Sequence, residues 1–143
     1  LAADLGAETI DVERTDPAEH VLAATGGRGV DAAVDTTPHA TQPVLDALRV
    51  TRAGGTVVLA GLKGPGRTVD GIATDDVALR RLTVRGVRAV EPAGFRAAIA
   101  LLESGTVPTD RFVTHSFPLA DAVRAVATLT DPTAEAVAVT VVP

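Results

Sequence analysis

Short runs of valine and alanine alternate along the chain with segments of helical pattern, and this alternation constrains the fold more than any other feature. The strand-like runs cover residues 30–34, 56–60, 82–86 and 137–141. Strands buried on both faces are rich in valine, and strands that alternate with helices form parallel sheets. The sequence therefore predicts an α/β fold with a largely parallel sheet.

Local signals place the helices between these runs. Asp16 followed by Pro17 predicts an N-cap and a first helical position, and this helix should run to about Thr25. A second helix should begin between Thr37 and Pro43. Apolar residues at helical spacing predict two more helices; these stripes are Phe95, Ile99 and Leu102, and Leu119, Val123, Val126 and Leu129.

Three shorter stretches also carry a prediction. Residues 8–12 are expected to form a short strand, and the glycine-containing residues 52–55 a tight turn into the strand that follows. A short helix is expected over residues 75–80, with Asp75 and Asp76 capping its start and complementing its dipole.

Composition excludes several classes of function. The net charge is −5 and Lys63 is the only lysine, so a nucleic-acid groove is not expected. No run approaches the ~20 apolar residues of a membrane helix, and no membrane partner is expected. The chain has no cysteine, and its three histidines lack ligand spacing, so no metal site is expected from these residues.

The first residues, Leu1 to Gly6, are typical of the end of a helix that is closed by a glycine. No methionine and no signal peptide are visible. We therefore expect that the sequence begins inside a domain whose earlier part lies upstream.

In an open parallel sheet, ligands bind beyond the carboxyl ends of the strands. That rule selects three places, which are Asp35 to Thr37 with nearby His39, Ala60 to Leu62, and Val87 with Arg88. Threonines offer hydroxyl groups, a glycine allows close approach to the backbone, and an arginine suits an anion. The same threonines could instead be helix caps, and the glycine could be only a turn.

No reaction follows from the residues alone. The glycines of residues 61–66 are not followed directly by a helix, so they form a loop rather than a phosphate-binding fingerprint. Ser104 and Ser116 have no base nearby in the sequence, and His115 suits a structural role better than a catalytic one.

The order of segments resembles the medium-chain dehydrogenase/reductase family, which includes zinc-containing alcohol dehydrogenases. The segments are LAADLGAETIDV, TGGRGVDAAVDTT, LRVTRAGGTVVLAGL, LTVRGVRAV and FRAAIALLESGTVPTDRFVTHSFPLADAVRAV. The resemblance implies that residues 1–143 are the C-terminal part of a dinucleotide-binding domain. The fold would be a partial Rossmann-type, doubly wound parallel sheet that lacks its first strand–helix–strand unit, with the catalytic domain upstream.

The resemblance also implies a cofactor, NAD or NADP, and the residues that would contact it. These are Thr36 and Thr37 beneath the cofactor, His39 beside the adenine, and Gly61, Leu62, Val87 and Arg88 against the nicotinamide. It implies no catalytic residue in this chain, and any zinc of the parent protein would be held by upstream residues.

By this resemblance the parent is an NAD(P)-dependent oxidoreductase that transfers hydride between an alcohol or carbonyl substrate and nicotinamide. A zinc-independent quinone or enoyl reductase of the same superfamily and a non-enzymatic nucleotide-binding module remain alternatives. The resemblance further implies a homo-oligomer, a dimer or tetramer, that pairs through strand Leu82–Gly86. Because no export signal is visible, a cytoplasmic location is expected.

Overall fold

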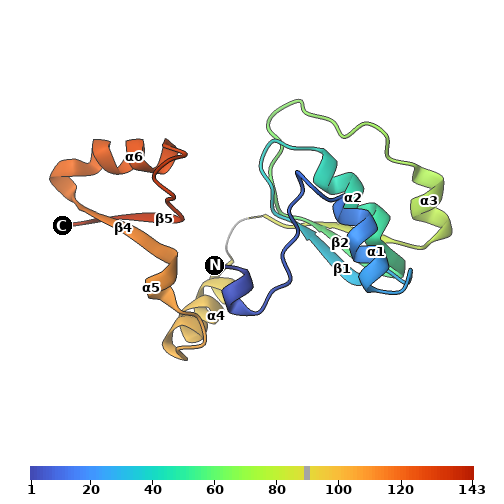
Figure 1. Cartoon of the computed structure of the whole chain (residues 1–143), viewed down its shortest axis with the longest axis horizontal. Helices are drawn as coiled ribbons and strands as arrows, with labels where there is room; N and C mark the ends of the chain where they lie inside the picture. The colour runs from blue at the N-terminus through green and yellow to red at the C-terminus, as the bar shows by residue number, and fades with distance from the viewer. Residues whose placement is uncertain (89–90) are drawn as a thin grey trace. The chain divides into compact units, whose positions relative to one another are not determined.

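Valine-rich strands form the centre of the first part of the chain, as the sequence predicts. The computed structural model describes residues 1–88 and 91–143, and the chain divides into an N-terminal unit (residues 2–89) and a C-terminal unit (residues 90–143). In the N-terminal unit, β1 (Val30–Asp35), β2 (Thr51–Leu59) and β3 (Thr83–Gly86) form one sheet in the order β1-β2-β3 (Figure 1). Both strand pairs are parallel, which confirms the predicted α/β class.

Helix α2 (Gln42–Val50) packs on this sheet, and α1 (Pro17–Ala24) packs against α2. Helix α1 begins where predicted, because the Asp16 carboxylate accepts the first free amide groups of the helix. Helix α2 links β1 to β2, packs on both strands and lies beside α1 (Figure 1). The buried core formed here consists of Ala18, Val44, Ala47, Val50, Thr51 and Val57.

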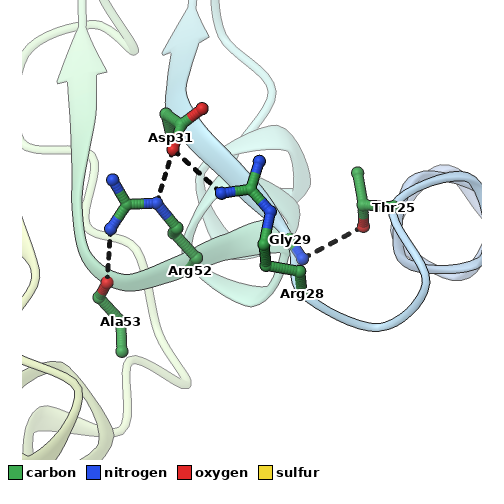
Figure 2. A network of polar contacts seen from close by, with 6 residues as sticks. All are labelled: Thr25, Arg28, Gly29, Asp31, Arg52 and Ala53. Atoms are coloured by element: carbon green, nitrogen blue, oxygen red, sulfur yellow. Dashed lines mark hydrogen bonds and ion pairs between the residues drawn. The ribbon is translucent and has the colours of Figure 1, made fainter.

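The predicted turn at residues 52–55 is wrong, because β2 begins at Thr51 directly after α2 and contains all four residues. The pairing of β1 with β2 shifts register between Val30 and Ala32, and Gly54 has a φ of 71°. The glycines that resemble a turn in the sequence therefore accommodate a bulge within a strand. Arg52, at the bulge, binds Asp31 of β1 (Figure 2).

The predicted strand at residues 8–12 is also wrong, since these residues have no regular structure. A strand needs a neighbour to satisfy its backbone groups, and within the described residues the outer edge of β1 has none. In the strand order 3-2-1-4-5-6, two strands separate strand 3 from strand 4. An unpaired segment at residues 8–12 and an exposed Val34 on β1 fit the predicted absence of that unit.

Two short helices, η1 (Ala3–Leu5) and α3 (Thr74–Leu79), differ in detail from the expectation. The first residues form the 3-10 helix η1, which Gly6 closes with a φ of 87°. Helix α3 connects β2 to β3, but its N-cap is Ala73 and no side chain caps it. Asp75 and Asp76 lie within its first turn, where carboxylates favour the helix dipole without capping the helix.

The C-terminal unit is built on two parallel strands. It contains α4 (Pro92–Glu103), α5 (Thr109–Phe112), β4 (Val113–Pro118), η2 (Leu119–Asp121), α6 (Ala122–Thr130) and β5 (Ala138–Val142). Helix α6 packs on β4 and β5, and Phe117 and Ala125 are buried between them. Both predicted apolar stripes are helical, yet their residues are exposed.

Within residues 1–88 and 91–143, no helix combines the length and the apolar character that crossing a membrane would require. Ala89 and Val90, the last residues of the LTVRGVRAV segment, lie outside the described residues.

Candidate functional site

The carboxyl ends of the three parallel strands of the N-terminal unit meet at one edge of the sheet. In the strand register, Asp35 pairs with Leu59 and Leu59 pairs with Gly86. The segment that follows each strand therefore starts from this edge. These segments contain all seven residues that the resemblance implicates, namely Thr36, Thr37, His39, Gly61, Leu62, Val87 and Arg88.

Backbone hydrogen bonds join these segments to one another. The carbonyl oxygen of Asp35 accepts the amide groups of Ala60 and Gly61 at 2.8 and 2.9 Å. The amide of His39 donates to the carbonyl of Leu62 at 3.2 Å, so the loops after β1 and β2 are held together along their length. The amide of Val87 donates to the carbonyl of Leu59 at 3.1 Å, which ties the third segment to the end of β2.

A buried ion pair lies beneath these loops. The side chain of Asp35 is fully enclosed, and its Oδ2 lies 2.7 Å from Nζ of Lys63. Its Oδ1 accepts the hydroxyl of Thr37 at 2.5 Å and the amide of Thr37 at 3.1 Å. Burial raises the pKa of Asp35, but the hydrogen bonds from Lys63 and Thr37 outweigh it, and the pKa lies below its ordinary value. Asp35 is therefore a carboxylate at neutral pH.

The ammonium group of Lys63 contacts both Asp35 and Thr37. Besides Asp35, its Nζ donates to the carbonyl oxygen of Thr37 at 2.6 Å and to the hydroxyl oxygen of Thr37 at 3.1 Å. The ammonium thus makes two hydrogen bonds to Thr37 and an ion pair with Asp35. Lys63 thus connects the loop after β2 to both the backbone and the side chains of the loop after β1.

Gly61 lies where these two loops cross. A Cβ atom at this position would lie 2.1 Å from the carbonyl oxygen of Thr37 and 2.7 Å from its amide nitrogen. Carbon atoms do not approach backbone atoms so closely, and the crossing therefore requires glycine. The side from which Gly61 lacks a side chain faces Thr37, so packing between the loops accounts for this residue without a ligand.

The implicated residues divide into two groups. Thr37 and Gly61 are half-buried and engaged within the loops. The other five are exposed, with Leu62 at 77% of its full accessibility; they are Thr36, His39, Leu62, Val87 and Arg88. His39 has a φ of 62°, a left-handed conformation that few residues other than glycine adopt. The exposed group offers a hydroxyl, an imidazole, apolar surface and a cation to a ligand.

Sequence reasoning did not identify the Asp35–Lys63 pair. The sequence places Asp35 in a candidate ligand-binding strand end and Lys63 in the loop after the next strand, but predicts no contact between them. Two features of the sequence indicate such a pair. Both residues follow strand-like runs, and parallel strands end on the same edge of the sheet. A carboxylate at the end of a buried strand also needs a cation or several N–H groups nearby.

Other candidate catalytic groups have structural partners. Nδ1 of His115 lies 3.0 Å from the hydroxyl of Thr114, and its ring stacks on Phe117 at 6.5 Å. The hydroxyl of Ser104 donates to the carbonyl of Leu101 at 2.7 Å. These contacts stabilise local structure in the C-terminal unit and form no pair of nucleophile and base.

The sequence and the fold both match known dehydrogenases. A "probable alcohol dehydrogenase" of Mycobacterium tuberculosis is 38% identical over 109 residues, which cover 76% of this chain and 29% of that protein. The erythritol/L-threitol dehydrogenase of Mycolicibacterium smegmatis is 37% identical over 123 residues, covering 85% of this chain and 33% of that protein. The chain thus spans about a third of the length of these relatives.

The crystal structure of a "putative zinc-binding dehydrogenase" from Sinorhizobium meliloti 1021, bound to NADP, has the same fold. It superposes with a TM-score of 0.80 at 29% identity and covers 94% of this chain and 39% of that one. The sequence profile of the family described as zinc-binding dehydrogenases matches residues 1–104. The resemblance found in the sequence is thereby confirmed, and the chain belongs to the zinc-binding dehydrogenase family.

Proposed function

We propose that this chain is the C-terminal part of the nucleotide-binding domain of an NAD(P)-dependent oxidoreductase of the alcohol dehydrogenase type. One observation carries the proposal: five exposed residues of varied chemistry follow three aligned strand ends on one edge of a parallel sheet. Ligands of open α/β sheets bind at this edge. The dehydrogenase relatives and the NADP-bound neighbour support the assignment.

The residues of this edge fit one side of a nicotinamide cofactor. Leu62 and Val87 offer exposed apolar surface against which a flat ring could lie. Thr36 and His39 offer hydrogen-bonding groups on the loop beside it, and Arg88 offers a positive charge for an anionic group. When bound, the nicotinamide supplies a hydride acceptor or donor, and these residues bind and orient it.

Zinc, which the family name implies, does not fit the residues present. In the part of the chain that the structure describes, no three His, Asp or Glu side chains gather closely enough to hold a metal ion. The chain also has no cysteine. Any zinc of the whole protein would require ligands outside these residues.

The whole protein is further proposed to be a cytoplasmic homo-oligomer that acts on a small alcohol or carbonyl compound. Strand β3 supports the oligomer, because it lies at an edge of the sheet and all four of its residues are exposed. Such an edge can pair with the same strand of a second copy.

Substitution of Leu62 tests the proposed cofactor edge. In the full-length protein that contains this chain, Leu62→Glu should weaken NADH or NADPH binding by about tenfold or more, because a carboxylate would face the cofactor. Leu79→Glu is the matched control, since Leu79 is 83% exposed and lies at the end of α3, before β3 begins. Fluorescence titration gives both dissociation constants.

Equal dissociation constants for wild type and Leu62→Glu would refute the placement of the cofactor. Turnover of an alcohol would favour the alcohol dehydrogenase reading over a quinone or enoyl reductase. Cofactor binding without turnover of either substrate class would favour a nucleotide-binding module.

A further inference from the structure

We propose that Lys63 is a positioning residue, whose buried ion pair with Asp35 fixes the two loops that bear Thr36, His39 and Leu62 before the cofactor arrives. The inference rests on the proposed function, because the loops that it fixes are those assigned to the cofactor. It concerns residues that would not themselves contact the cofactor.

The first argument is the number of links that pass through these side chains. Lys63 belongs to the loop after β2, yet each of its three contacts lies on Asp35 or Thr37, at the end of β1. Asp35 in turn holds Thr37 through both its amide and its hydroxyl. Removing the ammonium therefore breaks the side-chain connection between two loops that otherwise share only backbone hydrogen bonds.

The second argument is burial. The Asp35 side chain is 0% exposed and that of Lys63 is 12% exposed. A buried ion pair contributes little net stability, because desolvating two charges offsets their attraction. A buried ion pair nevertheless fixes the relative position of its two side chains, because separating them would leave an unpaired buried charge. A buried pair at this place is therefore better explained by a need for defined loop geometry than by a need for stability.

The third argument is proximity along the chain. Thr36 lies between Asp35 and Thr37, and Leu62 directly precedes Lys63. Both are exposed, although their neighbours are held in the buried network. A shift of the network must therefore move the exposed residues with it. Binding sites depend on such support, because groups that are placed before binding lose less entropy on binding.

A purely structural ion pair would contribute to folding and nothing more, and a pair of variants separates the two roles. Lys63→Met leaves the Asp35 carboxylate buried without its cation. The double variant Asp35→Asn/Lys63→Met removes both charges, so much of the stability should return. The connection between the loops does not return with it, because methionine cannot donate to Thr37.

The experiment measures NADH and NADPH dissociation constants by fluorescence in the full-length protein, with circular dichroism melts of every variant. Lys63→Met and the double variant should each bind the cofactor about tenfold more weakly than wild type. Lys63→Arg keeps the charge and its donors and should recover most of the affinity. Arg52→Met is the matched control, because its ion pair with Asp31 lies at the other end of β1, and affinity should not change.

The outcomes distinguish this inference from the function on which it rests. Wild-type protein that binds neither nucleotide would refute the proposed function and the inference together. If wild type binds and the folded double variant binds equally well, the proposed function stands and Lys63 is not a positioning residue. Equal weakening by Arg52→Met would also overturn the inference, since the effect would then be general to the sheet.

Discussion

The two ends of β1 carry the same chemistry in opposite surroundings. At the amino end, Asp31 Oδ1 accepts Arg52 Nε at 2.5 Å and Arg28 at 3.2 Å (Figure 2). The Asp31 and Arg52 side chains are 65% and 37% exposed, so water and salt screen their charges. At the carboxyl end, Asp35 and its cation Lys63 are almost wholly enclosed.

The two ends of β1 therefore differ in how strongly the local structure depends on its ion pair. Two arginines at the amino end, Arg28 and Arg52, hold Asp31 beside the bulge between β1 and β2 (Figure 2). Both pairs are exposed, so water can replace either arginine. At the carboxyl end no water can take over, because the carboxylate lies inside the protein. The edge proposed to bind the cofactor is thus the one that contains an enclosed ion pair, Asp35 with Lys63.

The largest expected effect is the loss of the Lys63 charge. Lys63→Met should lower the free energy of local opening of β1 and β2 by about 3 kcal/mol, because a buried carboxylate is left without its partner. Amide hydrogen exchange of the full-length protein measures this. Arg52→Met at the amino end should change the same protection little, since solvent replaces an exposed partner. Similar effects at both ends would remove the contrast between them.

A somewhat smaller effect is expected from adding one carbon at the crossing of the loops. Gly61→Ala places a methyl group against the Thr37 backbone and should destabilise the unit by about 1–3 kcal/mol. Gly86→Ala is the control, because a Cβ atom there would meet nothing within 4 Å. Thermal melts that fall equally for both variants would show that the loops do not cross as described.

The smallest expected effect is the response to acid. The pKa of Asp35 is lowered in the folded protein, so its contribution to stability is present above the ordinary aspartate pKa and is lost as the pH falls through the folded pKa. The pKa of Asp31 is also lowered, through hydrogen bonds from Arg52 and Arg28. In about 1 M NaCl the contribution of Asp31 to the loss of stability in acid should shrink, while the contribution of Asp35 should persist.

Acid unfolding of wild type, Asp35→Asn and Asp31→Asn, each at low and high salt, measures the contribution of each aspartate to stability. If salt reduced the acid dependence that is due to Asp35 as strongly as that due to Asp31, Asp35 would not be shielded from solvent.

The sequence predicted the elements that depend on local signals. The Asp16 cap, the strands before Asp35 and Leu62, and the two C-terminal helices follow from neighbouring residues. The rule for strand ends also placed Thr36, Leu62 and the other implicated residues on one edge. The strands at residues 30–35 and 83–86 were predicted to within one residue.

Features that depend on distant parts of the chain could not be predicted from local patterns. Residues 8–12 have the composition of a strand, but strand formation requires a neighbour. The glycines of residues 52–55 suit a turn and a bulge equally well, and only pairing with β1 decides between them. The contact between Lys63 and Asp35 exists because two loops cross at Gly61, a crossing that sequence spacing does not reveal.

The most direct test is hydrogen–deuterium exchange of the full-length protein with and without saturating NADH or NADPH. The account predicts that the cofactor protects peptides covering residues 36–39 and 61–63, at the carboxyl end of β1 and β2. Peptides covering residues 25–31 at the amino end of β1 should exchange equally in both states. Cofactor binding that leaves the first set unchanged, or that protects the Arg28–Asp31 end instead, would contradict the account.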